Sequence, residues 1–539
     1  VTLRGSAIQV TGFPAADLEA AVTFDHRMLR ATMLKAQLGA SHLVASGTVA
    51  WNGDADTQFD VAADDLDALV RAFDPGGVAV TGSARLTGTL QGNVGSPRAR
   101  GNLTAQQLIV DGTSVGALTA TLELADTRLT VDARAPHLNA QLGGVLDTRE
   151  PFAYQATAAL DRTSIPALLS ASLQQSTGIA EATVTATARA RGALRRPFES
   201  TGEVTVRELD AVVSGVPIHL EAPATVAIAP ENFAITPMQL RAGTITELRL
   251  QGTLGRNRSD HGLDVHLAST VPAILELAAP YLPERSVAAD ASQIGLDLHV
   301  GGTISVPEPS GTLSLRAAAF RYGDLPPMTD LALDGRIDRA QISMQSLTAT
   351  WQNAQLQATG AVPLRMILPE PAPGDRAGTF ATWRATWLAS LSAEEKPATL
   401  NARFTGITPD VLVPFMEAAQ LQEIGGTVAA TVTAEADAFA IDRVRGTVVL
   451  DEAALVMAGV PVAQSTPTRL RLENGTARIE NLRWNAQGNE VIASGVATIA
   501  GANPTVDVAI VGDIDLRIPG AFVSGVASGG IGYADLSIK

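Results

Sequence analysis

Ser164-Ile165-Pro166-Ala167-Leu168-Leu169 opens the stretch that decides the fold, residues 164–215. A strongly alternating run follows it, Ala182-Thr183-Val184-Thr185-Ala186-Thr187-Ala188-Arg189-Ala190, and a second run begins at Gly202-Glu203-Val204. A hydroxyl residue before an early proline marks a helix start, because proline's missing N–H is harmless in the first turn. Alternation of apolar and polar residues predicts strands with one apolar face. The stretch therefore predicts one short helix followed by two strands.

This helix signal returns at intervals of about 100 residues. Its copies are Thr270-Val271-Pro272, Thr408-Pro409-Asp410, Ile518-Pro519-Gly520 and a weaker one at Leu66-Asp67-Ala68. A strand of the form apolar-x-apolar-x-Gly-x-apolar returns independently, with its glycine at Gly47, Gly144, Gly252, Gly360 and Gly495. The Gly144 copy, residues 138–145, carries one extra residue and predicts a β-bulge. The two series lengthen together only between Gly360 and Pro409, so one insertion explains both.

These markers predict a single continuous repeat body over residues 1–539. Its units lie near 1–66, 67–165, 166–271, 272–408, 409–518 and 519–539, the last one partial, with an insertion at 364–396. The sequence starts and stops within the pattern, so we expect it to be a segment of a longer protein. Asn474-Gly475 between two alternating runs predicts a type I′ hairpin, as in an antiparallel meander.

Dozens of strands with one apolar face cannot form a flat open sheet, so the sheet must curl over its apolar side. Small inward residues such as Ala186 and Ala358 would fill that interior poorly. We therefore expect a mostly β fold, an elongated antiparallel β-groove (a β-taco) built from repeats of about 100 residues, each with one short helix. The expected lining residues are Leu118, Leu122, Val184, Leu248, Leu250, Leu263, Val265, Leu296, Leu298, Leu356 and Val491.

The insertion contains a helix signal with an aromatic side. Phe380, Trp383, Trp387 and Leu391 are spaced by three and four residues, which places them together on one helix face. One interpretation is a helix that caps the groove. The other, which we favour, is a helix packed over an edge of the sheet, because an amphipathic helix usually just buries its face.

Composition excludes several functional classes. The net charge of −16 argues against nucleic acid and against docking on anionic lipid through a basic patch. The chain has no cysteine, which removes disulfides, thiol catalysis and cysteine-ligated metals. No run of 18 apolar residues is long enough for a membrane-spanning helix, so membrane contact is expected through segments outside this chain.

No motif predicts catalysis, a metal or a cofactor. Gly112-Thr113-Ser114-Val115-Gly116 matches a nucleophile elbow, but strands follow it where a helix is required. Asn52, Asp54 and Asp56 begin like a calcium loop that then lacks its glycine and its glutamate. The seven histidines are scattered, and His266 and His299 are expected in solvent on polar strand faces. Asp64, Asp65 and Asp67 are explained by a helix start. The chain is therefore predicted not to be an enzyme.

The repeating string apolar-x-Gly-x-Leu-x-Gly, proline, Gly-x-Leu and a glycine-bounded turn resembles the AsmA-like superfamily. The string is fullest at residues 86–112 and weakest at 433–459, and it is most similar to TamB-type translocation and assembly module proteins. The resemblance implies a periplasmic lipid-lined β-groove, anchored to the inner membrane in the full-length protein. The implied role is carrying phospholipid between the inner and outer membranes. Insertion of outer-membrane proteins, alongside an outer-membrane β-barrel assembly protein, is the alternative.

Two further classes were weighed. A secreted β-solenoid adhesin usually shows short coils or calcium-binding nonapeptides, which this sequence lacks. A polysaccharide-active β-helix enzyme needs clustered carboxylates or aromatic sugar platforms, and the chain has only five tryptophans. A lipid-conducting groove fits best, because acyl chains gain about 0.8 kcal/mol per buried CH₂ on an apolar face without specific hydrogen bonds.

Overall fold

The computed structural model has a mostly β fold in which 32 strands belong to one antiparallel sheet. The structure describes residues 2–8, 16–73, 79–93, 95–168, 179–213, 215–256, 261–278, 287–322, 326–367, 387, 396–412, 422–438, 440–498, 500, 505–522 and 529–538. The chain divides into two compact units, Val1–Arg258 with Glu276–Pro280, and Ser259–Leu275 with Tyr281–Lys539. Each unit is described by itself below.

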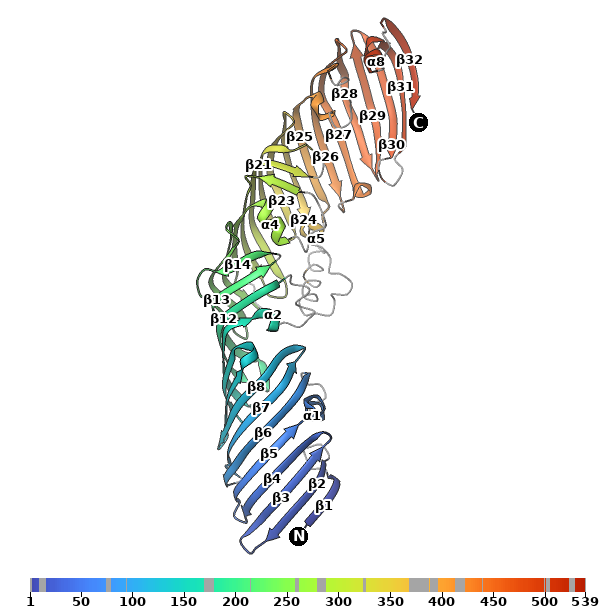
Figure 1. Ribbon diagram of the computed structural model, residues 1–539. Helices are drawn as coiled ribbons and strands as arrows, with labels where there is room; N and C mark the ends of the chain where they lie inside the picture. Colours follow the sequence, from blue (N-terminus) through green and yellow to red (C-terminus); the bar gives the residue numbers. More distant parts are fainter. Residues whose placement is uncertain are drawn as a thin grey trace. The chain divides into compact units, whose positions relative to one another are not determined.

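In its described residues, unit 1 has seventeen strands and three short helical segments. Figure 1 shows these strands arranged side by side. Its strands are β1 (Thr2–Ile8), β2 (Ala16–Phe24), β3 (Met28–Leu38), β4 (Ser41–Ala50), β5 (Asp54–Ala63), β6 (Val80–Asn93), β7 (Arg98–Val110), β8 (Thr113–Ala125), β9 (Arg128–Ala135), β10 (Ala140–Asp147), β11 (Ala153–Ser164), β12 (Ile179–Ala193), β13 (Arg196–Val213), β14 (Val216–Leu220), β15 (Ala224–Ile228), β16 (Asn232–Ala242) and β17 (Thr246–Gly255). The helical segments are α1 (Leu66–Phe73), α2 (Ile165–Leu168) and the 3-10 turn η1 (Pro136–Leu138).

Unit 2 has fifteen strands in its described residues. They are β18 (Leu263–Ser269), β19 (Val287–Asp290), β20 (Gln293–Gly302), β21 (Pro307–Tyr322), β22 (Met328–Asp338), β23 (Gln341–Trp351), β24 (Ala354–Pro363), β25 (Ala398–Ile407), β26 (Ile424–Ala436), β27 (Val444–Met457), β28 (Val460–Glu473), β29 (Thr476–Ala486), β30 (Asn489–Thr498), β31 (Thr505–Asp515) and β32 (Ile531–Ile538). Its helical segments are α4 (Val271–Ala278), which begins in this unit, α5 (Leu364–Ile367), η5 (Pro409–Leu412), η6 (Ile441–Arg443) and α8 (Arg517–Phe522).

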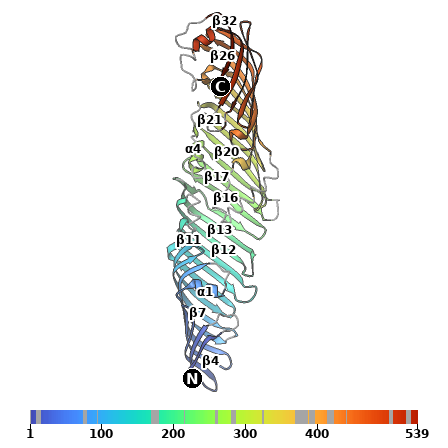
Figure 2. The same ribbon diagram turned by 90° about the vertical axis from the view of Figure 1, so that its right-hand side faces the viewer.

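Strand order follows the sequence in both units, so the sheet is a meander, and β12 and β13 lie side by side in both views (Figures 1 and 2). At two positions in the sheet, two consecutive short strands fill the place of one long strand. In unit 1, β14 and β15 both lie between β13 and β16. In unit 2, β20 pairs with β18 and β21, while β19 pairs with another part of β21. The Asn474-Gly475 hairpin is confirmed, with φ values of 53° and 70° between β28 and β29.

Each predicted helix start coincides with a short helix, although the one at Pro409 is a 3-10 helix. Hydroxyl and carboxylate oxygens cap the first turns of α4 and α1 by accepting hydrogen bonds from backbone N–H groups. The backbone N–H of Ala273 donates to Thr270 Oγ1 at 3.4 Å, and that of Val271 donates to buried Ser292 Oγ at 3.0 Å. Asp65 caps α1 by accepting from the N–H of Ala68 at 3.1 Å. α5 was not predicted.

A β-bulge lies on the strand opposite four of the five glycines that mark the predicted repeat. Gly47, Gly252, Gly360 and Gly495 each pair with an apolar residue, and the next two residues of that partner strand fall out of register. At Gly47, Gly360 and Gly495 a Cβ atom would lie 2.2–2.5 Å from a carbonyl oxygen of the following strand. A β-bulge bends its strand locally and increases the twist, and these glycines lie on the apolar side of the sheet.

The fifth glycine departs from this pattern, and the predicted bulge at residues 138–145 is wrong. β10 pairs with β9 without a register shift from Ala140 to Asp147. The extra residue is absorbed before the strand, where η1 ends at Asn139 in the left-handed conformation with φ 47°. A hydrogen bond from Thr163 Oγ1 to the carbonyl of Leu138, 2.6 Å long, holds this turn in place.

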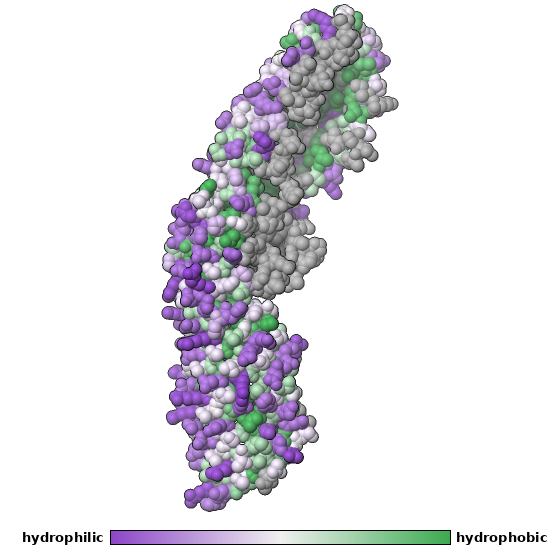
Figure 3. Space-filling model, viewed as in Figure 1, coloured by the Kyte–Doolittle hydropathy of each residue, from purple (hydrophilic) through white to green (hydrophobic). Residues whose placement is uncertain are grey.

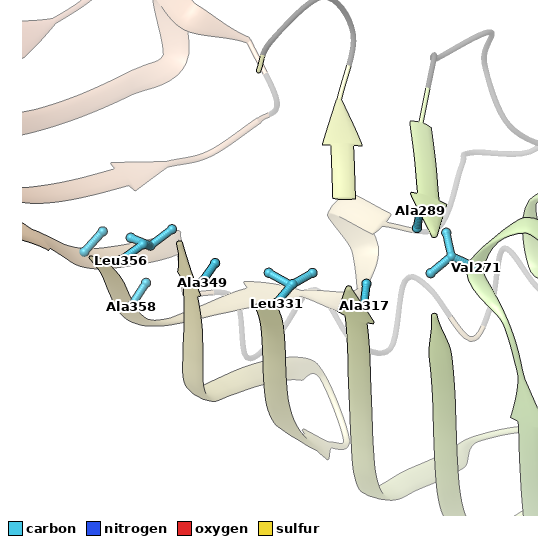
Figure 4. Packing of buried hydrophobic residues seen from close by; sticks show 8 residues of the cluster. Val271, Ala289, Ala317, Leu331, Ala349, Leu356 and Ala358 are labelled. Carbon is cyan, nitrogen blue, oxygen red and sulfur yellow. The ribbon is translucent and has the colours of Figure 1, made fainter. Parts of the chain in front are cut away.

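Buried side chains in the described residues are mainly small. Most of the buried apolar residues are alanine. The largest cluster lies in unit 2, where Val271 of α4 packs with residues of β19 and β21–β25 (Figure 4). Its buried members are Val271, Ala289, Ala317, Leu331, Ala349, Leu356, Ala358 and Ala402. The fold is therefore held by its backbone ladders and thin side-chain contacts, without a bulky core.

Candidate functional site: the apolar face of the sheet

In unit 1 the apolar residues of successive strands lie directly opposite one another. Residues that pair across neighbouring strands form one apolar row, which runs from β4 to β9. The row continues from β9 to β17 and contains no polar residue. Its members are Leu43, Val61, Leu86, Leu103, Ala120, Ala133, Leu142, Ala158, Ala188, Val204, Val226, Ile235 and Gly252.

Unit 2 has an equivalent row from β18 to β31. Its members are Leu267, Leu296, Leu313, Gly335, Met344, Gly360, Leu400, Ala434, Gly446, Leu472, Ala477, Ala497 and Val506. Within this unit, Figure 3 shows hydrophobic side chains gathered on the inner side, with hydrophilic ones over the outer face. We call the side of the sheet that carries these two rows the apolar face.

All eleven predicted lining residues lie on this face. Val265 pairs with Leu298, and Leu263 with Val300, across β18 and β20. Leu356 is buried beside Ala349, whereas the other ten predicted residues are half-buried. Leu118, Leu122, Val184, Leu248 and Leu250 occupy the same face in unit 1, as Leu296 and Val491 do in unit 2.

The apolar face is only partly covered. Leu142 is 43% exposed and Leu400 is 40% exposed, although both are members of the apolar rows. Short helices cover part of this face. Ala167 and Leu168 of α2 pack on Ala135 and Ala140 in unit 1. The face thus carries aliphatic side chains that remain partly exposed to solvent. These are the properties of a surface that can bind apolar ligands.

Most of the short helices occur at one end of the strands. We call this end the helix margin. In unit 1 it is the end where β5 and β11 lead into α1 and α2. In unit 2 it is the end where β18, β25 and β31 lead into α4, η5 and α8. Ile518 of α8 packs there on Val460, Val462 and Ala486. We call the opposite strand ends the hairpin margin.

The predicted insertion contacts unit 2 at its hairpin margin. The indole Nε1 of Trp387 donates to the carbonyl of Pro307 at 3.1 Å, and its ring packs with Leu364, Ala340 and Ile342. Pro307 begins β21, and Ala340 lies in the β22–β23 turn, so Trp387 lies at strand ends. Phe380, Trp383 and Leu391 lie outside the described residues.

The opposite face is polar and carries cross-strand ion pairs. His266 and His299 lie exposed on this face, as expected, and each also contacts an aspartate on the neighbouring strand. His266 Nδ1 lies 2.5 Å from Asp297 Oδ1, and His299 Nδ1 lies 2.8 Å from Asp264 Oδ1. The register of β18 against β20 creates both pairs. Their partners were not visible in the sequence because no local signal fixes that register.

The pKa of two aspartates is lowered by ion pairs with arginine. One pair joins neighbouring strands, and the other lies at the start of a short helix. A hydrogen bond from Arg85 lowers the pKa of Asp60 below its ordinary value. The side chain and backbone N–H of Arg517 likewise lower the pKa of Asp515 at the start of α8. These shifts come from structural ion pairs between neighbouring residues and strands, and they lie outside any enclosed cleft.

Hollows on the sheet surface are lined mostly by polar-face residues. One of about 560 Å³ spans β24–β28, with Thr433, Arg445 and Arg471 among its walls. In the described residues no three histidine, aspartate or glutamate side chains are arranged to hold a metal ion. None of the helices in the described part of the chain is long and apolar enough to cross a membrane.

The motifs that imitate active sites have ordinary local structures. Asp111 and Gly112 form the β7–β8 turn with positive φ, and Ser114 lies within β8, so the nucleophile-elbow geometry does not form. Asn52 Oδ1 accepts the N–H of Asp54 at 3.1 Å, which makes residues 52–54 a hairpin turn. Asp67 pairs with Arg71 one helical turn later at 2.9 Å.

No known protein family matches this chain, and neither a curated protein nor a solved structure is significantly similar to it.

Proposed function

We propose that the apolar face lines a groove that carries phospholipid acyl chains, and that the chain acts as a bridge-like lipid transport module in the periplasm. The observation that supports this most directly is the pair of uninterrupted apolar rows, one in each unit. Because the row contains no polar residue, an acyl chain that slides along it does not have to pass a hydrated side chain. Sliding along it therefore meets no large barrier.

Side-chain size supports the same proposal. The rows consist mainly of leucine, valine, alanine and glycine, so the surface is apolar without deep pockets that would hold one ligand in one position. Burying acyl chains contributes about 0.8 kcal/mol per CH₂ and requires no specific polar contact. A groove needs a curved sheet, and the β-bulges beside Gly47, Gly252, Gly360 and Gly495 are places where a strand bends locally.

Native mass spectrometry of the gently purified chain tests the proposal. We expect phospholipid to remain bound, with more than one molecule per chain, because a continuous face has no single binding position. Incubation with vesicles of phosphatidylethanolamine and phosphatidylglycerol should reload a delipidated sample. A folded chain that retains no phospholipid and takes none from vesicles would contradict the proposed function.

A further inference from the structure

The apolar face is covered unequally along its strands. Most of its buried residues lie in the half of each strand next to the helix margin. Examples are Ala63, Ala135, Ala182, Ala349 and Val460, whereas Ala55, Ile337 and Ala398 are buried near the hairpin margin. Other residues of the same face near the hairpin margin are open. Ile228 is 45% exposed and Val506 is 46% exposed.

The cause of this difference is the position of the helices. α2 closes the helix margin over Ala135 and Ala140, α4 does so over Ala289 and Ala317, and α8 does so over Val460. At the hairpin margin most strands are joined by tight turns, such as Asn474-Gly475. In the described residues, the exceptions there are α5 with Trp387 and the 3-10 turn η6.

Charge follows the same division in unit 2. Near strand ends of this unit, most cationic residues lie at the hairpin margin, where acidic residues lie among them in similar number. The cations are Arg336, Arg339, Arg365, Lys396, Arg443, Arg445, Arg471 and Arg478, and the acidic residues include Glu308, Asp338, Glu435, Asp442 and Glu473. Near the helix margin the described cations are fewer, with Arg321 and Arg517 at strand ends, and Glu423, Glu490, Asp513 and Asp515 lie there instead. An anionic group therefore meets less repulsion at the hairpin margin than at the helix margin.

We propose that phospholipid lies across the strands in one orientation, with its acyl chains toward the helix margin and its phosphate headgroup at the hairpin margin. This inference rests on the proposed function. The dimensions agree, since one leaflet contributes about 15 Å of hydrocarbon and strands advance about 3.3 Å per residue. Four or five residues of strand thus accommodate the acyl chains. Arginine at the hairpin margin supplies the planar donors that suit a phosphodiester.

Photolabelling of the whole chain distinguishes the two ends of the lipid. One probe is phosphatidylglycerol with a diazirine in its headgroup, and the other carries the diazirine at the end of an acyl chain. We expect the headgroup probe to label residues 228–231 and 437–443, and the acyl probe to label residues 165–168 and 271–278. Headgroup labelling at the helix margin, or equal labelling of both margins, would overturn the orientation while leaving lipid binding intact. Failure of both probes to label either margin would reject the proposed function as well.

A charge-reversed pair provides the second arm. Arg443 and Arg445 are exposed at the hairpin margin, and Arg321 is exposed near the helix margin. Arg443→Glu with Arg445→Glu should lower headgroup labelling of residues 437–443 by about tenfold, as expected from loss of one charged hydrogen bond. Acyl labelling and the thermal midpoint should stay unchanged. Arg321→Glu should leave headgroup labelling as it is. An equal loss in both variants would show that only net charge matters and would overturn the orientation.

Discussion

Met344 on β23 and Gly360 on β24 lie directly opposite one another on the apolar face, and residues 345–346 immediately beside them bulge out of register. Gly360 has no room for a side chain, because a Cβ atom would lie 2.3 Å from the carbonyl oxygen of Thr399 on β25. Three strands are therefore drawn together at one point. Ala31 with Gly47, Ile235 with Gly252, and Ile479 with Gly495 repeat the arrangement.

The first prediction concerns this glycine. Gly360→Ala should destabilise the chain by about 1–3 kcal/mol, because the added methyl group overlaps a carbonyl of the neighbouring strand, which must move. The measurement is urea unfolding followed by circular dichroism. Gly425→Ala is the matched control, since no atom lies within 4 Å of the position that its Cβ would take and its φ is not in the left-handed region. Equal effects of the two substitutions would mean that β24 and β25 are not in close approach.

The glycine spacing was visible in the sequence, but its physical meaning was not. Alternation in residues such as Leu263, Val265 and Leu267 is local, so strands and their two faces followed from the sequence. The positions of bulges and the partners of His266 and His299 depend on register, which arises from contacts between strands distant in sequence. The helix starts at Pro166 and Pro272 could also be predicted, because a hydroxyl residue before an early proline is likewise a local signal. The division between helix and hairpin margins required the strand order.

The second prediction concerns room on the apolar face. Leu298→Trp should leave the thermal midpoint close to that of the unsubstituted chain, because Leu298 is half-buried and Gly311 lies opposite it. Ala317→Trp should destabilise strongly, since Ala317 is 4% exposed within the cluster that α4 covers. Differential scanning calorimetry of both variants provides the comparison. Collapse of the fold in Leu298→Trp would show a filled interior at that strand.

The third prediction concerns acid. The pKa of Asp515 is lowered in the folded chain by Arg517, so its carboxylate stabilises the fold fully above its ordinary pKa of 3.8. That contribution is lost as the pH falls below 3.8 through the lower, folded-state pKa. Asp515→Asn should reduce stability at neutral pH and flatten its dependence on pH in the acid range, measured by urea unfolding between about pH 2 and 7. Asp535→Asn, on exposed β32, serves as the control and should follow the unsubstituted chain.

The last prediction places a charge in the path of the lipid. Leu250 lies on the apolar face of unit 1 and Leu298 on that of unit 2. A carboxylate at either position must lose water inside the groove or hold water against passing acyl chains. Desolvating it costs several kcal/mol. We expect Leu250→Asp with Leu298→Asp to abolish lipid transfer by the protein between donor and acceptor vesicles, while circular dichroism shows a folded sheet.

The control for this block is Arg249→Asp, on the opposite face next to Leu250. Arg249 is exposed and lies 3.4 Å from Glu247, so its replacement changes charge in water without entering the apolar row. Transfer should continue in this variant. A conduit acts in series, so one obstructed strand stops flux even when every other strand is intact. Undiminished transfer by the folded Leu250→Asp, Leu298→Asp protein would therefore reject the groove, and equal loss in Arg249→Asp would place the lipid on the polar face.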